Sequence, residues 1–131
     1  MAQGYLIDSN VIIGFLAGKI PSSGMKAISA IVDQTPRISV ISQIEVLRFT
    51  DTPKNEKVLA DFVDSSIIHP LSLGIVRRTI ELCKQNKIKL PDAIIAATAL
   101  TENFILVTRN TDDFKNISNL EVFNPWETQE S

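Results

Sequence analysis

Three carboxylates, Asp8, Glu45 and Asp92, each follow a predicted strand or stand near the start of a predicted helix. In a parallel α/β sheet these positions meet at one edge, so we expect the three side chains to converge there. Two carboxylates about 4 Å apart repel by about 4 kcal/mol at an effective dielectric constant near 20, so a cluster of them needs a counterion to stay ionised. Oxygen ligands of this kind favour Mg²⁺ or Mn²⁺. The pattern therefore predicts a divalent-cation site.

Each acid also has a purely structural interpretation. Asp8 precedes a predicted helix and is a good N-cap residue. Glu45 follows Ser42 by three residues, which is the spacing of a capping box. Asp92 stands in a first helical turn after Pro91, where the helix dipole favours negative charge. Isolated caps do not predict a shared location, so convergence on one edge distinguishes the two interpretations.

The elements that must position these acids alternate along the chain. Short apolar runs predict strands at residues 4–7, 37–40, 66–69, 105–108 and 120–123. Helical spacing and capping residues predict helices at residues 11–17, 24–32, 42–49, 53–64, 72–87 and 90–100. This alternation, with strands that show little polar periodicity, predicts an α/β fold with a central, mainly parallel sheet of four to five strands and helices on both faces.

Length and composition indicate one globular domain. The chain has 131 residues, of which 44% are hydrophobic and 21% charged. We expect residues 1–126 to form a single domain and residues 127–131 to be a C-terminal tail. The net charge of −2 argues against a wide basic surface for nucleic acid.

Location is also constrained by the sequence. Cys83 is the only cysteine, which excludes an intrachain disulfide and a cysteine-based zinc site. The first residues lack the basic region of a signal peptide, and no apolar run approaches the roughly 20 residues of a membrane span. We therefore expect a cytoplasmic protein that makes no use of a membrane.

Other catalytic arrangements fit less well. His69 is the only histidine and precedes Pro70, which favours a structural role. Ser9 lacks the G-x-S-x-G elbow of a serine hydrolase. Neither a G-x-x-x-x-G-K loop nor a G-x-G-x-x-G fingerprint occurs. A phosphatase of the haloacid-dehalogenase type needs a second acid two residues after the first, where this chain has Asn10.

Four motifs in order carry a resemblance to a known family. They are YLIDSNVI at residues 5–12, SQIEVL at 42–47, LPDAIIAA at 90–97, and LVTRN at 106–110 with the pair Asp113 and Phe114. In this order and spacing the sequence resembles PIN-domain ribonucleases of the VapC type, the toxins of type II toxin-antitoxin pairs. The resemblance implies a PIN-like three-layer α/β/α sandwich and Mg²⁺- or Mn²⁺-dependent cleavage of RNA.

The resemblance also implies roles for particular residues. Three acids would bind metal, Ser9 would orient Asp8 through its hydroxyl, and Asn10 would support the site. The fourth acid would come from the last motif, where Asn110 stands at a position that is acidic in many relatives. Asp113 is favoured over Asp112, with Asn110 as a neutral polar contact. Residues implied as metal-binding and catalytic are Asp8, Glu45, Asp92 and Asp113.

Partners are likewise implied by the resemblance. They are an RNA substrate, which Arg109 would contact, a cognate antitoxin protein, and a second copy of the chain in a homodimer. A competing hypothesis remains open: the chain is a PIN-like binding module in which the acids only cap helices. The low net charge and Asn110 motivate that hypothesis.

Overall fold

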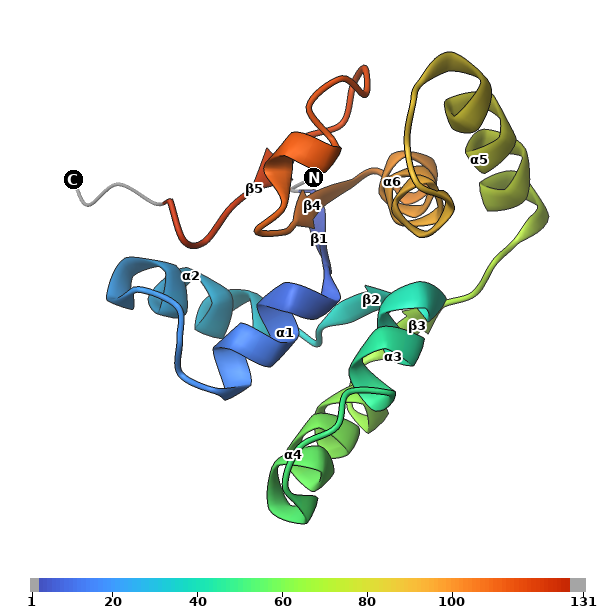
Figure 1. The fold of residues 1–131 in the computed structure, drawn as a ribbon. Helices are drawn as coiled ribbons and strands as arrows, with labels where there is room; N and C mark the ends of the chain where they lie inside the picture. Colours follow the sequence, from blue (N-terminus) through green and yellow to red (C-terminus); the bar gives the residue numbers. More distant parts are fainter. Residues whose placement is uncertain (1–2, 128–131) are drawn as a thin grey trace.

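The structure is a computed structural model that describes residues 3–127. In this part of the chain, five parallel strands form one sheet with the order β3-β2-β1-β4-β5 (Figure 1). The strands are β1 (Gly4–Ile7), β2 (Arg37–Ser39), β3 (Ile67–His69), β4 (Phe104–Val107) and β5 (Val122–Phe123). The predicted parallel sheet is confirmed, and the predicted strands overlap the observed ones.

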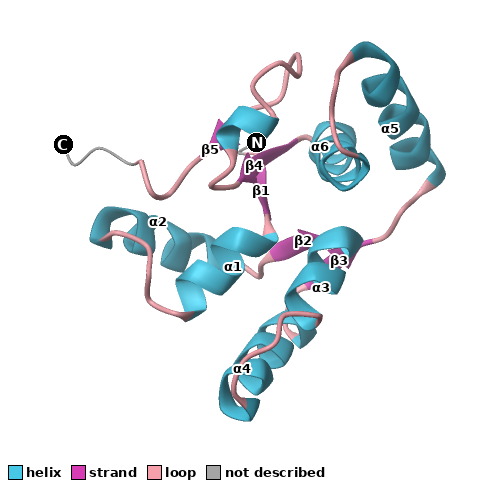
Figure 2. Cartoon of the chain, in the orientation of Figure 1, coloured by secondary structure: helices cyan, strands magenta, loops and turns pink. Residues whose placement is uncertain are grey.

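Six α-helices and one short 3-10 helix connect the strands (Figure 2). The α-helices are α1 (Ser9–Leu16), α2 (Ser22–Val32), α3 (Val40–Leu47), α4 (Pro53–Asp64), α5 (Leu73–Gln85) and α6 (Leu90–Glu102). The 3-10 helix, η1 (Thr111–Asp113), follows β4. Every predicted helix is present, with ends that differ by a few residues.

The sheet separates two hydrophobic cores because successive side chains of a strand point to opposite faces. Leu6 and Leu106 pack with buried residues of α5 and α6. Ile7 and Val107, the next residue of each strand, pack with buried residues of α1, α2 and α4. Figure 1 shows α1 and α2 on one side of the strands and α5 and α6 on the other. The three-layer α/β/α architecture is therefore confirmed.

The chain changes direction across the sheet at β1. From β1 it proceeds outward through β2 and β3, and it then returns to place β4 on the other side of β1. Ile7 is level with Val107 in the register of the two strands. In open α/β sheets, ligand sites lie at the carboxyl ends of the strands at such a switch point. Asp8 and Thr108, which follow the two strands, stand at this place.

The predicted capping box at Ser42 is wrong. Helix α3 begins at Val40, and the Oγ of Ser39 accepts a hydrogen bond from the N–H of Ile41 at 2.9 Å. Ser42 lies inside the helix, and within residues 3–127 its buried Oγ has no hydrogen-bond partner. The cap lies three residues earlier because β2 runs directly into the helix, so the last extended residue is Ser39. Glu45 therefore has no capping role in this helix.

The described part of the chain ends at Glu127. The predicted tail, residues 127–131, lies outside the described residues except for Glu127, so it stays a prediction. No helix within residues 3–127 combines the length and the apolar character needed to cross a membrane.

The two serines give a paired stability test. Ser39→Ala removes the α3 cap and should lower the free energy of unfolding by about 1 kcal/mol. Ser42→Ala removes a buried hydroxyl that has no partner, so it should leave stability unchanged or raise it by up to about 1 kcal/mol. Urea unfolding of both variants measures the difference. A loss of about 1 kcal/mol in Ser42→Ala with no loss in Ser39→Ala would instead place the cap at Ser42.

Candidate active site

Asp8 is buried at the carboxyl end of β1, where it also caps α1. Its side chain is 5% exposed, and its N–H donates to the carbonyl of Val107 on β4 at 2.9 Å. One carboxylate oxygen, Oδ1, accepts from the N–H of Ser9 at 2.8 Å. The other, Oδ2, accepts from the hydroxyl of Thr108 at 2.9 Å and from the amide of Asn10 at 3.3 Å. The side chain is thus held in one orientation by three donors.

The electrostatic environment of Asp8 includes other carboxylates. Burial raises its pKa from 3.8 to about 6, although the hydrogen bonds from Thr108 and the Ser9 N–H act in the opposite direction. The negative charges of Glu45 and Asp92 raise the pKa further. Carboxylates that are far apart in the sequence therefore act on one another at this edge of the sheet. Isolated helix caps do not account for that proximity.

Glu45 reaches the same edge from α3. Its Oε1 accepts a hydrogen bond from the Ser9 hydroxyl at 3.1 Å. The expected role of Ser9 is therefore corrected: its hydroxyl orients Glu45, and its backbone N–H orients Asp8. The reason is local, because Ser9 is the first residue of α1, so its N–H turns back to the cap while its side chain faces α3.

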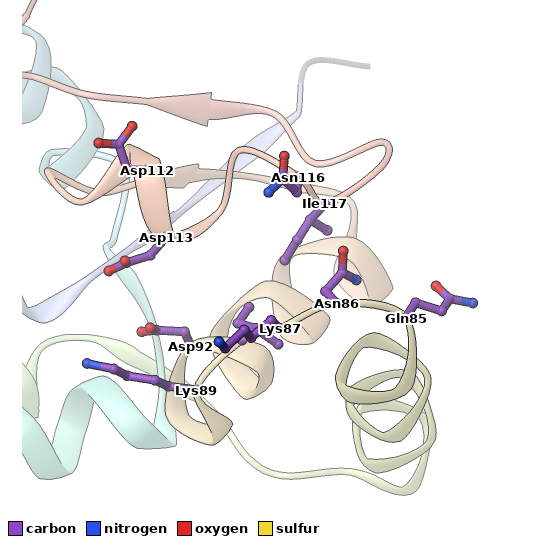
Figure 3. Close-up of a pocket in the computed structure, with 10 residues that line it drawn as sticks. Gln85, Asn86, Lys87, Lys89, Asp92, Asp112, Asp113, Asn116 and Ile117 are labelled. Atoms are coloured by element: carbon purple, nitrogen blue, oxygen red, sulfur yellow. The ribbon is translucent and has the colours of Figure 1, made fainter.

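Asp92 and Asp113 complete the acidic group from the other side of the site. Burial raises the pKa of Asp92, as do the charges of Asp113 and Glu45, while Lys89 lowers it. Figure 3 shows the carboxylates of Asp92 and Asp113 turned toward the same space. Asp112 lines the same pocket, with its carboxylate pointing in another direction. Of the two neighbouring acids, Asp113 is the one whose charge raises the pKa of Asp92. We call Asp8, Glu45, Asp92 and Asp113 the acidic cluster.

Thr108 is a site residue that the sequence analysis missed. It is fully buried, and its Oγ also accepts hydrogen bonds from the Asn10 amide at 3.3 Å and the Asn110 N–H at 3.2 Å. A signal for it exists in the sequence, because Thr108 ends the strand predicted at residues 105–108. The structure pairs that strand in parallel with β1, which brings the Thr108 hydroxyl beside Asp8. Asn110 takes part through its backbone, while its side chain is exposed.

Asn10 and Arg109 connect the cluster to the C-terminal segment. The Asn10 carbonyl oxygen Oδ1 accepts from the N–H of Arg109 at 3.0 Å, and the Arg109 carbonyl accepts from the amide of Asn124 at 3.3 Å. The guanidinium of Arg109 lies over the ring of Trp126, 4.8 Å from its centroid. A Cβ on Gly14 would lie 2.7 Å from the Trp126 ring, so this glycine lets the ring pack closely against α1.

His69 does not take part in this arrangement. Its Nε2 lies 3.3 Å from Nη1 of Arg37, and its ring packs edge-on against Phe104. Burial lowers its pKa, and the charges that act on it are those of Arg37 and Glu102. These contacts support the structural role expected for the histidine.

The donor chemistry of the acidic cluster fits a hard divalent cation. All four groups are carboxylates, and Asp8 and Asp92 both have pKa values raised partly by like charge, which a bound cation would relieve. The side chains do not form a closed cage: among residues 3–127, no three acidic, histidine or cysteine side chains are grouped closely enough to hold a metal ion together. Binding would therefore require carboxylate movement or water ligands.

Comparison with known proteins places this chain in a family. The model of the PIN domain family matches residues 5–120. The chain belongs to the PIN-domain family.

The similar proteins are of the VapC type. Ribonuclease VapC1 of Rickettsia felis is 34% identical over 92% of this chain and 95% of its own length. A toxin-antitoxin complex from Klebsiella pneumoniae contains a chain that is 31% identical, with a TM-score of 0.75, covering 95% of this chain and all of that one. VapBC2 from Rickettsia felis, solved with a promoter DNA fragment, is 26% identical with a TM-score of 0.75 over 92% of this chain and 97% of its own. The resemblance predicted from the four motifs is confirmed.

The raised pKa of Asp8 predicts a pH-dependent stability. The folded state favours the protonated carboxyl of Asp8. The stability that this group contributes is therefore fully present below about pH 4, and it is lost as the pH rises above about 6. Asp8→Asn cannot titrate at this position. In the presence of EDTA, its free energy of unfolding relative to the wild type should increase by about 2 kcal/mol between pH 4 and pH 7.

Urea unfolding across this pH range provides the measurement. Asp64→Asn removes one exposed acid at the end of α4 and controls for net charge. A stability difference between Asp8→Asn and the wild type that does not change with pH would show that Asp8 ionises freely in the folded chain.

Proposed function

We propose that this chain is a divalent-metal-dependent endoribonuclease and acts as the toxin of a toxin-antitoxin pair. The acidic cluster supports the proposal, because its four carboxylates come from separate elements and lie near enough for their charges to raise the pKa of Asp8 or of Asp92. The PIN-domain family and the VapC ribonucleases among the relatives support it. The substrate class is single-stranded or looped RNA, and the products carry 5′-phosphates.

In the proposed mechanism, residues of the chain hold the metal ion and keep its ligands oriented. Asp8, Glu45, Asp92 and Asp113 would hold Mg²⁺ or Mn²⁺. When bound, the ion would activate the attacking water and stabilise negative charge on the scissile phosphate and the leaving oxygen. Thr108 and the Ser9 N–H keep Asp8 oriented, and the Ser9 hydroxyl keeps Glu45 oriented. Arg109, stacked on Trp126 next to the site, contacts a backbone phosphate.

The solved relatives support a protein partner. A 31% identical chain forms part of a toxin-antitoxin complex, and we propose that an antitoxin binds this chain as well. From the family resemblance, we also propose that the chain forms a homodimer. Large apolar side chains on α3, α4 and the segment between them remain exposed, which is typical of protein-binding surfaces: Ile44, Leu47, Phe49 and Val58. We place the protein in the cytoplasm, where its RNA substrates are.

Two neighbouring acids provide a matched test of the active site. Asp113→Asn should lower Mn²⁺-dependent cleavage of single-stranded RNA by about 100-fold or more, since even outer-shell partners of a metal site contribute 10- to 100-fold. Asp112→Asn removes the same charge one residue away, on a side chain turned away from the cluster, and should stay within about threefold of the wild type. The initial rates of both variants are compared under identical conditions.

Asp8→Asn and Asp92→Asn should also abolish cleavage while the fold is retained, because loss of like charge relieves repulsion as it removes a ligand. Circular dichroism confirms the fold. If both variants cleave as fast as the wild type, the acidic cluster is not the active site. If Asp112→Asn is inactive and Asp113→Asn is active, the fourth acid is Asp112.

The alternative function is a binding module without catalysis. One structural observation favours it: within residues 3–127, no three acidic side chains are grouped closely enough to hold an ion together. Calorimetric titration with Mn²⁺ at pH 7.5 separates the two functions. A nuclease site should bind Mn²⁺, and Asp92→Asn should weaken that binding by about tenfold or more. No measurable binding by the wild type would favour the binding module.

A further inference from the structure

A cavity of about 660 Å³ opens beside the acidic cluster, at Asp92 and Asp113. One wall is the loop between α5 and α6, and the other is η1 with the turn that follows it (Figure 3). Small-molecule sites in proteins have volumes of about 300 to 1,000 Å³. The cavity therefore has room for one nucleotide of a longer strand.

The two ends of the cavity differ in chemistry. In Figure 3, the carboxylates of Asp92 and Asp113 and the amine of Lys89 lie at one end, while Asn86, Asn116 and Ile117 lie at the other. Lys89 and Asp92 both line the cavity at this end, so the lysine amine is available beside the carboxylates. A ligand that fills the cavity would thus meet charge at the acidic cluster and amide groups farther away.

The charged end suits a phosphate. The chain carries a net charge of −2, and the acidic cluster alone would repel an approaching nucleic-acid backbone. Three carboxylates line the cavity, those of Asp92, Asp112 and Asp113. Lys87 and Lys89 also line it and are both exposed, so they supply positive charge next to the carboxylates. A backbone phosphate can then lie close to the acids without a wide basic surface.

The amide end suits the edge of a base. Asparagine side chains both donate and accept hydrogen bonds, as base edges do. The Asn86 amide nitrogen donates to the carbonyl of Leu82 at 3.2 Å, which leaves its oxygen as an acceptor. Asn116 is exposed on the opposite wall. Ile88 and Ile117 also line the cavity and offer apolar surface to a base plane.

We propose that this cavity is a base-binding subsite that holds one unpaired nucleotide of an RNA strand next to the scissile bond. Lys89 lies beside the phosphate of that nucleotide, and Asn86 and Asn116 contact the edge of its base. A base can enter such a cavity when it is unpaired and unstacked, which restricts the substrate to single strands, loops and ends. This subsite rests on the proposed ribonuclease function and adds a base preference to it.

Cleavage mapping on a randomised single-stranded RNA tests the subsite. The wild type should prefer particular bases at one position next to the cut. Asn86→Ala and Asn116→Ala should each reduce that preference by about fivefold or more, as expected for a lost hydrogen bond. Lys89→Gln should raise KM and lower the salt slope of binding by about one, with the base preference retained. Asn55→Ala and Lys54→Gln, both exposed on α4, are the matched controls and should behave as the wild type does.

Binding provides a second readout that does not depend on cleavage. Fluorescence anisotropy of A, C, G and U octamers on the Asp113→Asn chain should show a base preference that Asn116→Ala reduces in the same background. Equal binding and equal cleavage of all four bases by the parent chains would overturn the subsite. A preference that neither asparagine variant changes would also overturn it. A chain that binds with the expected preference but never cleaves supports the subsite and contradicts the ribonuclease function.

Discussion

The burial of the Asp8 carboxylate at the junction of β1 and β4 is the constraint on which the site depends. A carboxylate removed from water needs hydrogen bonds to remain tolerable in the fold. Here the donors are the N–H of Ser9, the amide of Asn10 and the hydroxyl of Thr108. Because Thr108 follows β4 and the other two residues begin α1, the same bonds connect two strands that are about 100 residues apart. These hydrogen bonds hold the Asp8 carboxylate in one orientation, but they do not fully offset the effect of burial, so its pKa remains raised.

Ser9 and Asn10 connect Asp8 to other elements of the fold. Ser9 connects Asp8 to Glu45 through its backbone and its hydroxyl, so α3 is positioned relative to α1 by a polar contact as well as by apolar packing. Asn10 connects the same site to the backbone of Arg109. The C-terminal segment holds that arginine from the other side through Trp126. The acidic cluster is therefore supported by several elements, which agrees with a site that must keep its geometry while like charges repel.

The distribution of charge explains how an acidic protein can act on an acidic polymer. Burial raises the pKa values of Asp8 and Asp92, and neighbouring negative charges raise them further. A divalent cation would relieve the repulsion between these charges. Lysines that line the adjacent cavity add positive charge at the same place. Attraction to a phosphate backbone can thus be local, and the overall charge of −2 does not oppose the proposed function.

Apolar periodicity and capping residues are local signals. The order of strands and helices, the parallel sheet and the acids of the site could therefore be predicted from the sequence. The sequence could not locate the α3 cap, since Ser39 and Ser42 are the same residue type and only the end of β2 decides between them. The sequence favoured Asp113 over Asp112 as the fourth acid but could not exclude Asp112, because adjacent residues share the same sequence context. In the structure, η1 directs the two side chains differently. The sequence analysis also missed Thr108, whose role exists only through the register of β4 against β1. Contacts of this kind, between residues distant in the chain, were decided by the tertiary structure alone.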